Sequence, residues 1–132
     1  MGGDFLSSPN KEKDSFDGEN SFVKFGSSGM QGWRYRMEDA HLQSLNISNL
    51  DIFGVFDGHG GKEVSQFVKN HFIEEFAKNK NTKHSNITES LIETFLKMDD
   101  LMLTQSGKEE LYHLNKISKE SKIGRASCRE RV

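Results

Sequence analysis

The sequence predicts an α+β fold in which short strands come first and helices follow. Between Ser21 and Asp57, apolar residues roughly alternate with polar ones, which is the period of strands with one buried face. After Gly61 the apolar residues recur at three and four positions, which is the period of a helix covered along one side. Because strands and helices are segregated along the chain, we expect the helices to cover one face of a sheet.

Composition limits the classes of partner. The chain has 132 residues, of which 29% are charged and 33% hydrophobic, as in one small soluble domain or part of a larger one. A net charge of −2 predicts no nucleic-acid partner. The single cysteine, Cys128, excludes an internal disulfide and favours a reducing, cytoplasmic location, with nuclear or membrane-associated pools as alternatives. No apolar run approaches the roughly 20 residues of a transmembrane segment.

The strand region begins after a polar N-terminal stretch. Residues 1–20 carry the only proline, Pro9, and the turn pair Asp17-Gly18, so they are predicted to form an irregular arm. Four strands are then expected, over residues 22–25, 31–36, 41–47 and 51–56. Turns are expected at residues 26–29, 37–39 and 48–49. The last strand is the most apolar and is expected to be the most buried.

Two helices are predicted by apolar stripes. The first runs from about Gly61 to Lys78, and its stripe consists of Val64, Phe67, Val68, His71, Phe72 and Phe76. The second follows Asn86, which is spaced from Glu89 like a helix cap from its partner. Its stripe consists of Ile87, Leu91, Ile92, Phe95, Met98 and Met102.

The periodicity fades from Leu111 onward. Residues 123–132 resemble the translation of a common sequencing-library adapter, so we interpret them as a cloning or assembly scar and exclude them from the fold. The expected organisation is therefore an arm over residues 1–20, the N-terminal portion of a domain over 21–122, and the scar over 123–132. On this interpretation the native chain continues further.

Acidic residues gather where two predicted strands end. Asp57 ends a strand and is followed by Gly58-His59-Gly60-Gly61, while Glu38 and Asp39 lie at the end of another strand. Carboxylates are hard ligands for Mg²⁺ or Mn²⁺, and the glycines allow a main-chain carbonyl to approach the ion. Each motif alone is more often a solvated turn or loop. Their concentration at neighbouring strand ends favours half of a metal site.

Other phosphate and metal motifs fit less well. A phosphate-binding P-loop needs Ser or Thr after Gly61-Lys62 and a glycine at the position of Phe56, and the sequence has Glu63 and phenylalanine there. The Asp-rich loop of an EF-hand is absent from the sequence. A cysteine nucleophile would have to be Cys128, in the suspected scar.

Together these segments resemble the metal-dependent serine/threonine protein phosphatases of type 2C, in the form found in ciliates and other protists. The resemblance rests on Gln-Gly-Trp-Arg at 31–34, Met-Glu-Asp at 37–39 and Asp-Gly-His-Gly-Gly at 57–61, with the opening Met-Gly and residues 9–13. It covers residues 1 to about 100. The implied fold is a four-layer αββα sandwich, in which two antiparallel sheets are flanked by helices, and only its N-terminal part is present.

The resemblance also implies a binuclear Mg²⁺ or Mn²⁺ site. Asp57 would bridge the two ions, Glu38 and the Gly58 carbonyl would ligate one of them, and Asp39 would act through water. Arg34 would bind the substrate phosphate, and His59 would be the general acid in hydrolysis of phosphoserine and phosphothreonine by metal-activated water. The implied partners are phosphoprotein substrates, and the protein is expected to be a monomer.

The family's later metal-binding aspartates have no counterpart in this sequence, whose remaining acids fall mostly on predicted helices. We therefore expect this chain to be an inactive fragment of an active phosphatase. The alternative is a non-catalytic pseudophosphatase or binding module on the same fold. Retention of the candidate ligands and of Arg34 and His59 argues against it.

Gly2 is a possible lipidation site. Met1-Gly2 permits N-myristoylation, and family members with this opening carry it, although Leu6 stands where the simple motif has Ser or Thr. A single acyl chain would give only weak, reversible membrane association.

Overall fold

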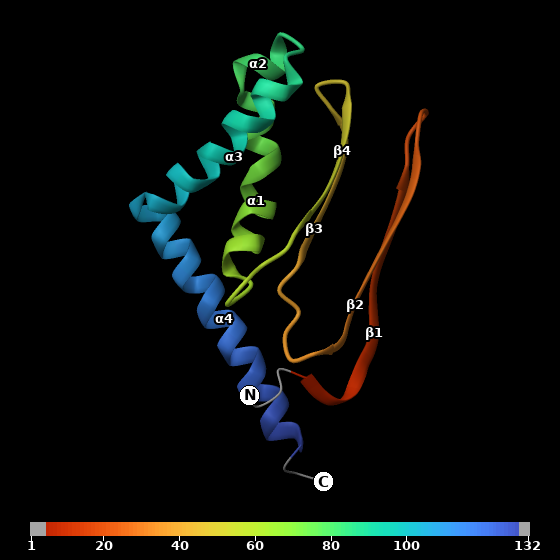
Figure 1. Ribbon diagram of the computed structural model, residues 1–132, viewed down its shortest axis with the longest axis vertical. Coiled ribbons are helices and arrows are strands. Elements are labelled where there is room, and N and C mark those ends of the chain that lie inside the picture. Colours follow the sequence, from red (N-terminus) through yellow and green to blue (C-terminus); the bar gives the residue numbers. More distant parts are fainter. Residues whose placement is uncertain (1–4, 130–132) are drawn as a thin grey trace. The chain divides into compact units, whose positions relative to one another are not determined.

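The computed structural model describes residues 5–129, with side chains as far as Lys119 (Figure 1). It divides into two compact units, one up to residue 37 and one from residue 38, and each is described by itself. The elements, in chain order, are β1 (Phe5–Glu19), β2 (Lys24–Arg34), β3 (Ala40–Ile47), β4 (Leu50–Phe56), α1 (Glu63–Lys78), α2 (Lys80–Lys83), α3 (Ile87–Leu103) and α4 (Gln105–Arg129).

The first unit is a long antiparallel hairpin of β1 and β2. Its ladder runs from Glu19 opposite Lys24 to Phe5 opposite Arg34. At the turn, the side-chain oxygen of Asn20 accepts hydrogen bonds from the backbone N–H groups of Phe22 and Val23, each at 2.9 Å. This is the local side-chain to backbone bonding that favours asparagine in turns.

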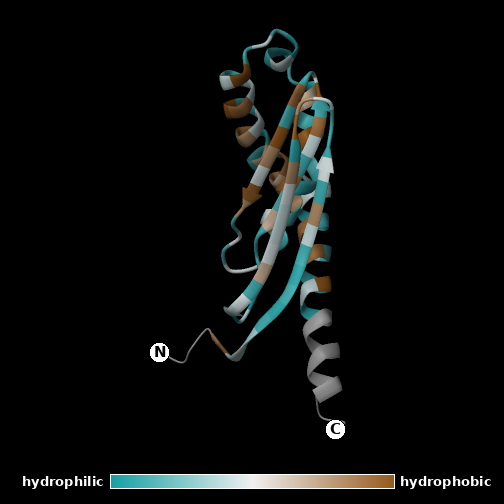
Figure 2. Ribbon diagram, turned by 90° about the vertical axis from the view of Figure 1, so that its right-hand side faces the viewer, coloured by the Kyte–Doolittle hydropathy of each residue, from teal (hydrophilic) through white to brown (hydrophobic). Residues whose placement is uncertain are grey.

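Two predictions for this region were wrong. The stretch expected to be an irregular arm forms β1, and the turn expected at residues 26–29 lies inside β2. Most of β1 is hydrophilic (Figure 2) and exposed, so the strand has no buried face to produce an alternating pattern. The Asp17-Gly18 pair lies within the ladder, opposite Gly26 and Phe25, because the chain turns at Asn20 instead.

The second unit begins with the antiparallel hairpin of β3 and β4, and both strands were predicted. The expectation that the last strand is the most buried was wrong, because the buried strand residues, Ala40 and Leu42, lie in β3. The turn between the two strands was also predicted, and Ser48 and Asn49 adopt the positive φ values, 50° and 62°, that suit tight hairpin turns. Helices α1 and α3 confirm the two predicted apolar stripes. The side chain of Asn86 caps α3 by accepting from the backbone N–H of Glu89 at 3.5 Å.

The core of the second unit lies where α1 packs against β3 and α3. It is built from four buried side chains: Leu42, Phe72, Phe76 and Met98. Phe72 also packs edge-on against Phe95 of α3, with ring centroids 5.1 Å apart. Helices were expected to cover one face of a sheet, and α1 does so on the β3–β4 pair, with α3 packed against α1. The αββα sandwich implied by the resemblance stays a prediction.

Helices α2 and α4 were not predicted. Helix α4 begins after Thr104, whose hydroxyl oxygen accepts from the backbone N–H of Gly107 at 3.0 Å, and it runs through the stretch whose apolar periodicity fades. Its backbone continues over residues 123–129, which leaves the proposed scar untested. Gly2 and residues 130–132 lie outside the described residues. Among the described helices, none is long and apolar enough to span a membrane.

Candidate metal centre

The register of the β3–β4 hairpin determines which acidic residues meet. Ala40, the first residue of β3, pairs with Phe56, the last residue of β4. Glu38 and Asp39 directly precede this pair, and Asp57 and Gly58 directly follow it. Because the strands are antiparallel, both segments leave the hairpin at the same end. The hairpin thus brings the backbone segments that carry Glu38, Asp39 and Asp57 to one end.

Gly58 allows this end of the hairpin to be compact. A Cβ atom at this position would lie 2.5 Å from the carbonyl oxygen of Glu38 and 3.0 Å from that of Gly61. Both distances involve backbone, which cannot yield cheaply, so only glycine fits. Two residues further on, Gly60 has a φ of +75°, in the left-handed region that glycine adopts without strain. Backbone geometry therefore requires the glycines at positions 58 and 60 of this segment.

The side chains on either side of Gly58 in the sequence are accessible to solvent. Those of Asp57 and His59 are 73% and 85% exposed, and the Nδ1 atom of His59 lies 3.7 Å from Oδ1 of Asp57 and 3.4 Å from its backbone carbonyl oxygen. Asp39 is exposed, and Glu38 is partly buried. Mg²⁺ usually keeps several water ligands when it binds to a protein. Solvent-exposed carboxylates are compatible with such a partly hydrated ion.

The oxygen atoms at this end of the hairpin are suited to form part of the coordination shell of Mg²⁺ or Mn²⁺. Two carboxylates, from Glu38 and Asp57, and the carbonyl of Gly58 are all oxygen ligands of the type that Mg²⁺ and Mn²⁺ prefer. Within residues 5–119, no group of three or more His, Cys, Asp or Glu side chains is arranged to hold a metal ion. The described residues can therefore contribute ligands to an ion and cannot enclose one with side chains alone.

Sequence reasoning missed Ser65. This residue lies in the first turn of α1 and is only 4% exposed. Its hydroxyl oxygen lies 2.5 Å from the carbonyl oxygen of Glu38 and 3.0 Å from that of Lys62. A small polar residue next to the apolar stripe of α1 was the available signal, but serine near a helix start is usually explained by capping.

Arg34 is the last residue of β2, where it pairs with Phe5 and is exposed. It belongs to the first unit, and the candidate metal ligands belong to the second. Its proposed contact with a substrate phosphate therefore rests on the resemblance and on the planar, bidentate chemistry of the guanidinium group.

An apolar groove of about 680 Å³ borders the candidate centre. Its walls come from β4, α1 and α3, and Asp57, Gly58 and His59 lie among the residues that line it. Large apolar side chains around it remain accessible, including Val55 at 66% and Phe95 at 53% exposure. Exposed apolar surface of this kind marks a place where a ligand, a partner or further protein binds.

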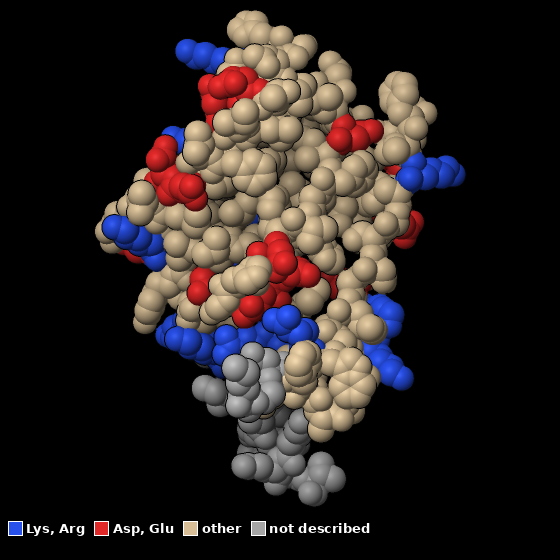
Figure 3. Space-filling view, viewed as in Figure 1, with Lys and Arg blue, Asp and Glu red and all other residues tan. Residues whose placement is uncertain are grey.

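The surface charge agrees with the composition. On the face shown in Figure 3, acidic and basic side chains occur among uncharged residues, and neither sign covers the face.

Comparison with known proteins gives one consistent result. The sequence profile of the protein phosphatase 2C family matches residues 23–122. Probable protein phosphatase 2C 4 of Paramecium tetraurelia is 54% identical over 113 residues, which are 85% of this chain and 38% of that protein. Probable protein phosphatase 2C 6 of the same ciliate is 43% identical over 131 residues, covering 98% of this chain and 44% of its own length.

A plant relative shows the same pattern. Probable protein phosphatase 2C 21 of Arabidopsis thaliana is 46% identical over 110 residues, which are 83% of this chain and 31% of that protein. The chain thus spans less than half the length of each of these curated relatives.

Proposed function

The chain belongs to the protein phosphatase 2C family, and from that premise we propose that the complete protein hydrolyses phosphoserine and phosphothreonine in proteins. Members of this family are metal-dependent serine/threonine phosphatases. The observation that carries the proposal is that the segments bearing Glu38 and Asp57 leave the same end of the β3–β4 hairpin, with the backbone of Glu38 packed against Gly58.

Glu38, Asp57 and the Gly58 carbonyl would hold Mg²⁺ or Mn²⁺, with Asp57 shared between two ions and Asp39 acting through water. When bound, two such metal ions lower the pKa of a bound water and neutralise charge on a phosphate ester. The further protein ligands of the pair would come from sequence beyond these residues. The chain's own contribution would be to present two carboxylates and a carbonyl at one end of the hairpin.

Arg34 and His59 would act on the substrate. A guanidinium group can donate two parallel hydrogen bonds to the phosphoryl oxygens and keep the ester in register. Nδ1 of His59 faces Asp57, so Nε2 is the nitrogen available to a substrate. As water forms the new bond to phosphorus and the ester P–O bond breaks, a proton passes from Nε2 to the departing serine or threonine oxygen. The products are the free hydroxyl and phosphate.

The chain of 132 residues is proposed to be an inactive part of the enzyme. Three observations support this: its length relative to its relatives, the incomplete ligand set among the described residues, and the open apolar groove beside the centre. The cytoplasmic location, the monomeric state, acylation of Gly2 and the adapter origin of residues 123–132 stay predictions.

Phosphate release from a phosphothreonine peptide in Mn²⁺ tests the proposal. The protein expressed from its complete coding sequence should release phosphate, its Asp57→Asn variant should not, and the 132-residue chain should be inactive. Asp100→Asn, on an exposed face of α3, is the matched control and should keep full activity. Phosphopeptide binding without hydrolysis by the complete protein would instead support a binding module.

A further inference from the structure

We propose that Ser65 is a positioning residue for the metal ligand Glu38. The inference rests on the proposed function, because it assumes that Glu38 binds Mg²⁺ or Mn²⁺. It adds a residue outside the set expected to touch metal or substrate, and it explains what fixes Glu38 against the hairpin.

Three oxygen atoms surround one point beside Gly58. The position that a Cβ on Gly58 would occupy is 2.5 Å from the Glu38 carbonyl oxygen, 2.9 Å from the Ser65 hydroxyl oxygen and 3.0 Å from the Gly61 carbonyl oxygen. The hydroxyl of Ser65 has a single proton and two carbonyl neighbours, Glu38 and Lys62. The hydroxyl lies closer to the Glu38 carbonyl oxygen, at 2.5 Å, than to the Lys62 carbonyl oxygen, at 3.0 Å.

The hydrogen bond connects a fixed element to an irregular one. Helix α1 is anchored through Phe67, Phe72 and Phe76, which are 2%, 3% and 1% exposed. Glu38, in contrast, lies in residues 35–39, which belong to no helix or strand. A buried donor on α1 that holds the Glu38 carbonyl therefore limits where the Glu38 carboxylate can lie relative to Asp57.

This arrangement predicts an effect on metal binding that exceeds its effect on folding. Removing a partner that orients a metal ligand typically weakens metal affinity by about 10- to 100-fold. Loss of one buried hydroxyl of this kind removes little volume, so the variant Ser65→Ala should fold. Ser90→Ala is the matched control, because Ser90 is also a fully buried helical serine and bonds Thr82, remote from Glu38 in sequence.

The test measures Mn²⁺ binding by calorimetry on the complete protein, with the thermal midpoint of the metal-free form recorded for each variant. Ser65→Ala should raise the Kd for Mn²⁺ about tenfold, and Ser90→Ala should leave this Kd unchanged. Both variants should lower the thermal midpoint of the metal-free protein. Activity assays should show a raised KM for Mn²⁺ and a kcat close to wild type at saturating metal.

A third variant separates the two hypotheses. If Glu38→Gln weakens Mn²⁺ binding and Ser65→Ala does not, the role of Ser65 is overturned and the proposed metal site stands. If Glu38→Gln leaves binding unchanged, Glu38 is not a ligand and both proposals fall. Equal losses of affinity in Ser65→Ala and Ser90→Ala would show a general structural effect and would overturn the positioning role.

Discussion

Ala40 lies opposite Phe56 in the antiparallel ladder of β3 and β4. This pairing brings Glu38 and Asp57, which are distant in sequence, to the same end of one hairpin. A register slip of one residue would turn Leu42 and its neighbours out of the core. The packing that stabilises the hairpin therefore also sets the position of the two candidate ligands.

Gly58→Ala should destabilise the protein and weaken Mn²⁺ binding. The added Cβ would lie 2.5 Å from the Glu38 carbonyl oxygen, and forcing an extra methyl group into a packed site costs about 1–3 kcal/mol. The measurement is the free energy of unfolding in urea. Gly54→Ala in β4 is the control, since its Cβ would meet only ordinary contacts at 3.6 and 3.8 Å. Equal stability of the two variants would contradict the close approach at Gly58.

His59→Gln should slow hydrolysis of phosphothreonine by about 10²–10⁴-fold, because general acid catalysis by a positioned histidine contributes an effect of that order. Hydrolysis of p-nitrophenyl phosphate should fall much less, since nitrophenolate leaves without a proton. The measurement compares kcat for the two substrates. His84→Gln, next to α2, is the control and should affect neither. An equal loss on both substrates would argue against proton donation.

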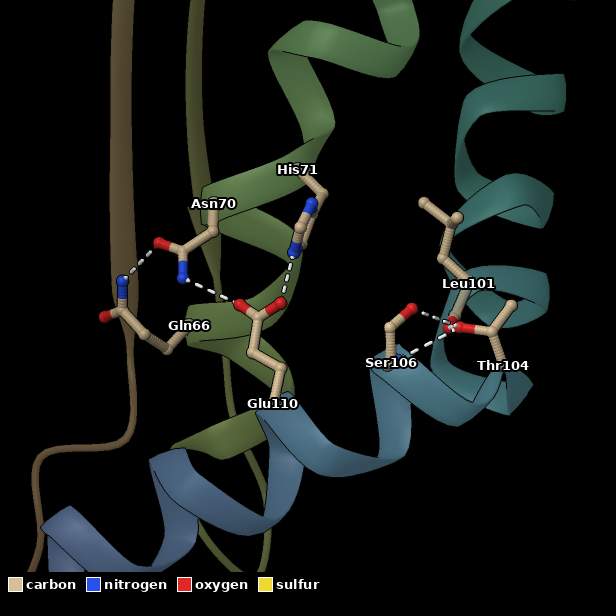
Figure 4. A network of polar contacts seen from close by, with 8 residues as sticks. Gln66, Asn70, His71, Leu101, Thr104, Ser106 and Glu110 are labelled. Atoms are coloured by element: carbon tan, nitrogen blue, oxygen red, sulfur yellow. Dashed lines mark hydrogen bonds and ion pairs between the residues drawn. The ribbon is translucent and has the colours of Figure 1, made fainter.

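The contact between α1 and α4 should depend on His71 and Glu110. Nε2 of His71 lies 2.7 Å from one carboxylate oxygen of Glu110, and the side chain of Asn70 donates to the other at 3.2 Å (Figure 4). The two partners are about one-third exposed, so a coupling of about 1 kcal/mol is expected. A double-mutant cycle of His71→Gln and Glu110→Gln in urea measures it. If the losses of stability in the two single variants simply add in the double variant, His71 and Glu110 do not stabilise the contact between α1 and α4.

Lys78→Gln should raise the pKa of Glu74. The hydrogen bond and charge of Lys78 hold the Glu74 pKa below its ordinary value of 4.5. A lowered carboxyl pKa contributes stability above the ordinary pKa, and that stability is lost as pH falls through the lowered value. An NMR titration of the Glu74 carboxyl should show its pKa move toward 4.5. An unchanged Glu74 pKa in Lys78→Gln would contradict the pairing of Glu74 with Lys78. So would an equal change of the Glu74 pKa in the control variant Lys97→Gln on α3.

The same ion pair acts oppositely on the lysine. The hydrogen bond to Glu74 raises the pKa of Lys78 above its ordinary value of 10.5. Its contribution to stability is present below that ordinary pKa and is lost as pH rises through the raised value. Both side chains are 62% exposed, so the effect on stability should fall as salt is added.

The parts of the fold that bury one face could be predicted from sequence. The β3–β4 hairpin and helices α1 and α3 surround Leu42, Phe72, Phe76 and Met98, and this burial produces their strand and helix periods. The β1–β2 hairpin has little buried surface and is held by backbone pairing, which leaves no periodic signal. Helix α4 is mostly polar and was missed for the same reason.

In the candidate site, too, some residues could be predicted from the sequence and others could not. Carboxylates and glycines at strand ends could be recognised from Glu38 to Gly61, because ligand chemistry and turn geometry both depend on residue type. The role of Ser65 could not, since it depends on where α1 lies against the segment before β3. That placement is a property of tertiary packing.

The proposed metal site is tested most directly by asking whether Glu38 and Asp57 bind the same Mn²⁺ ion. Mn²⁺ affinity should be measured calorimetrically for the complete protein and for Glu38→Gln, Asp57→Asn and the double variant. If the two carboxylates share an ion, Glu38→Gln should cost little further affinity once Asp57 is replaced. Losses in the two single variants that simply add in the double variant would contradict a shared site.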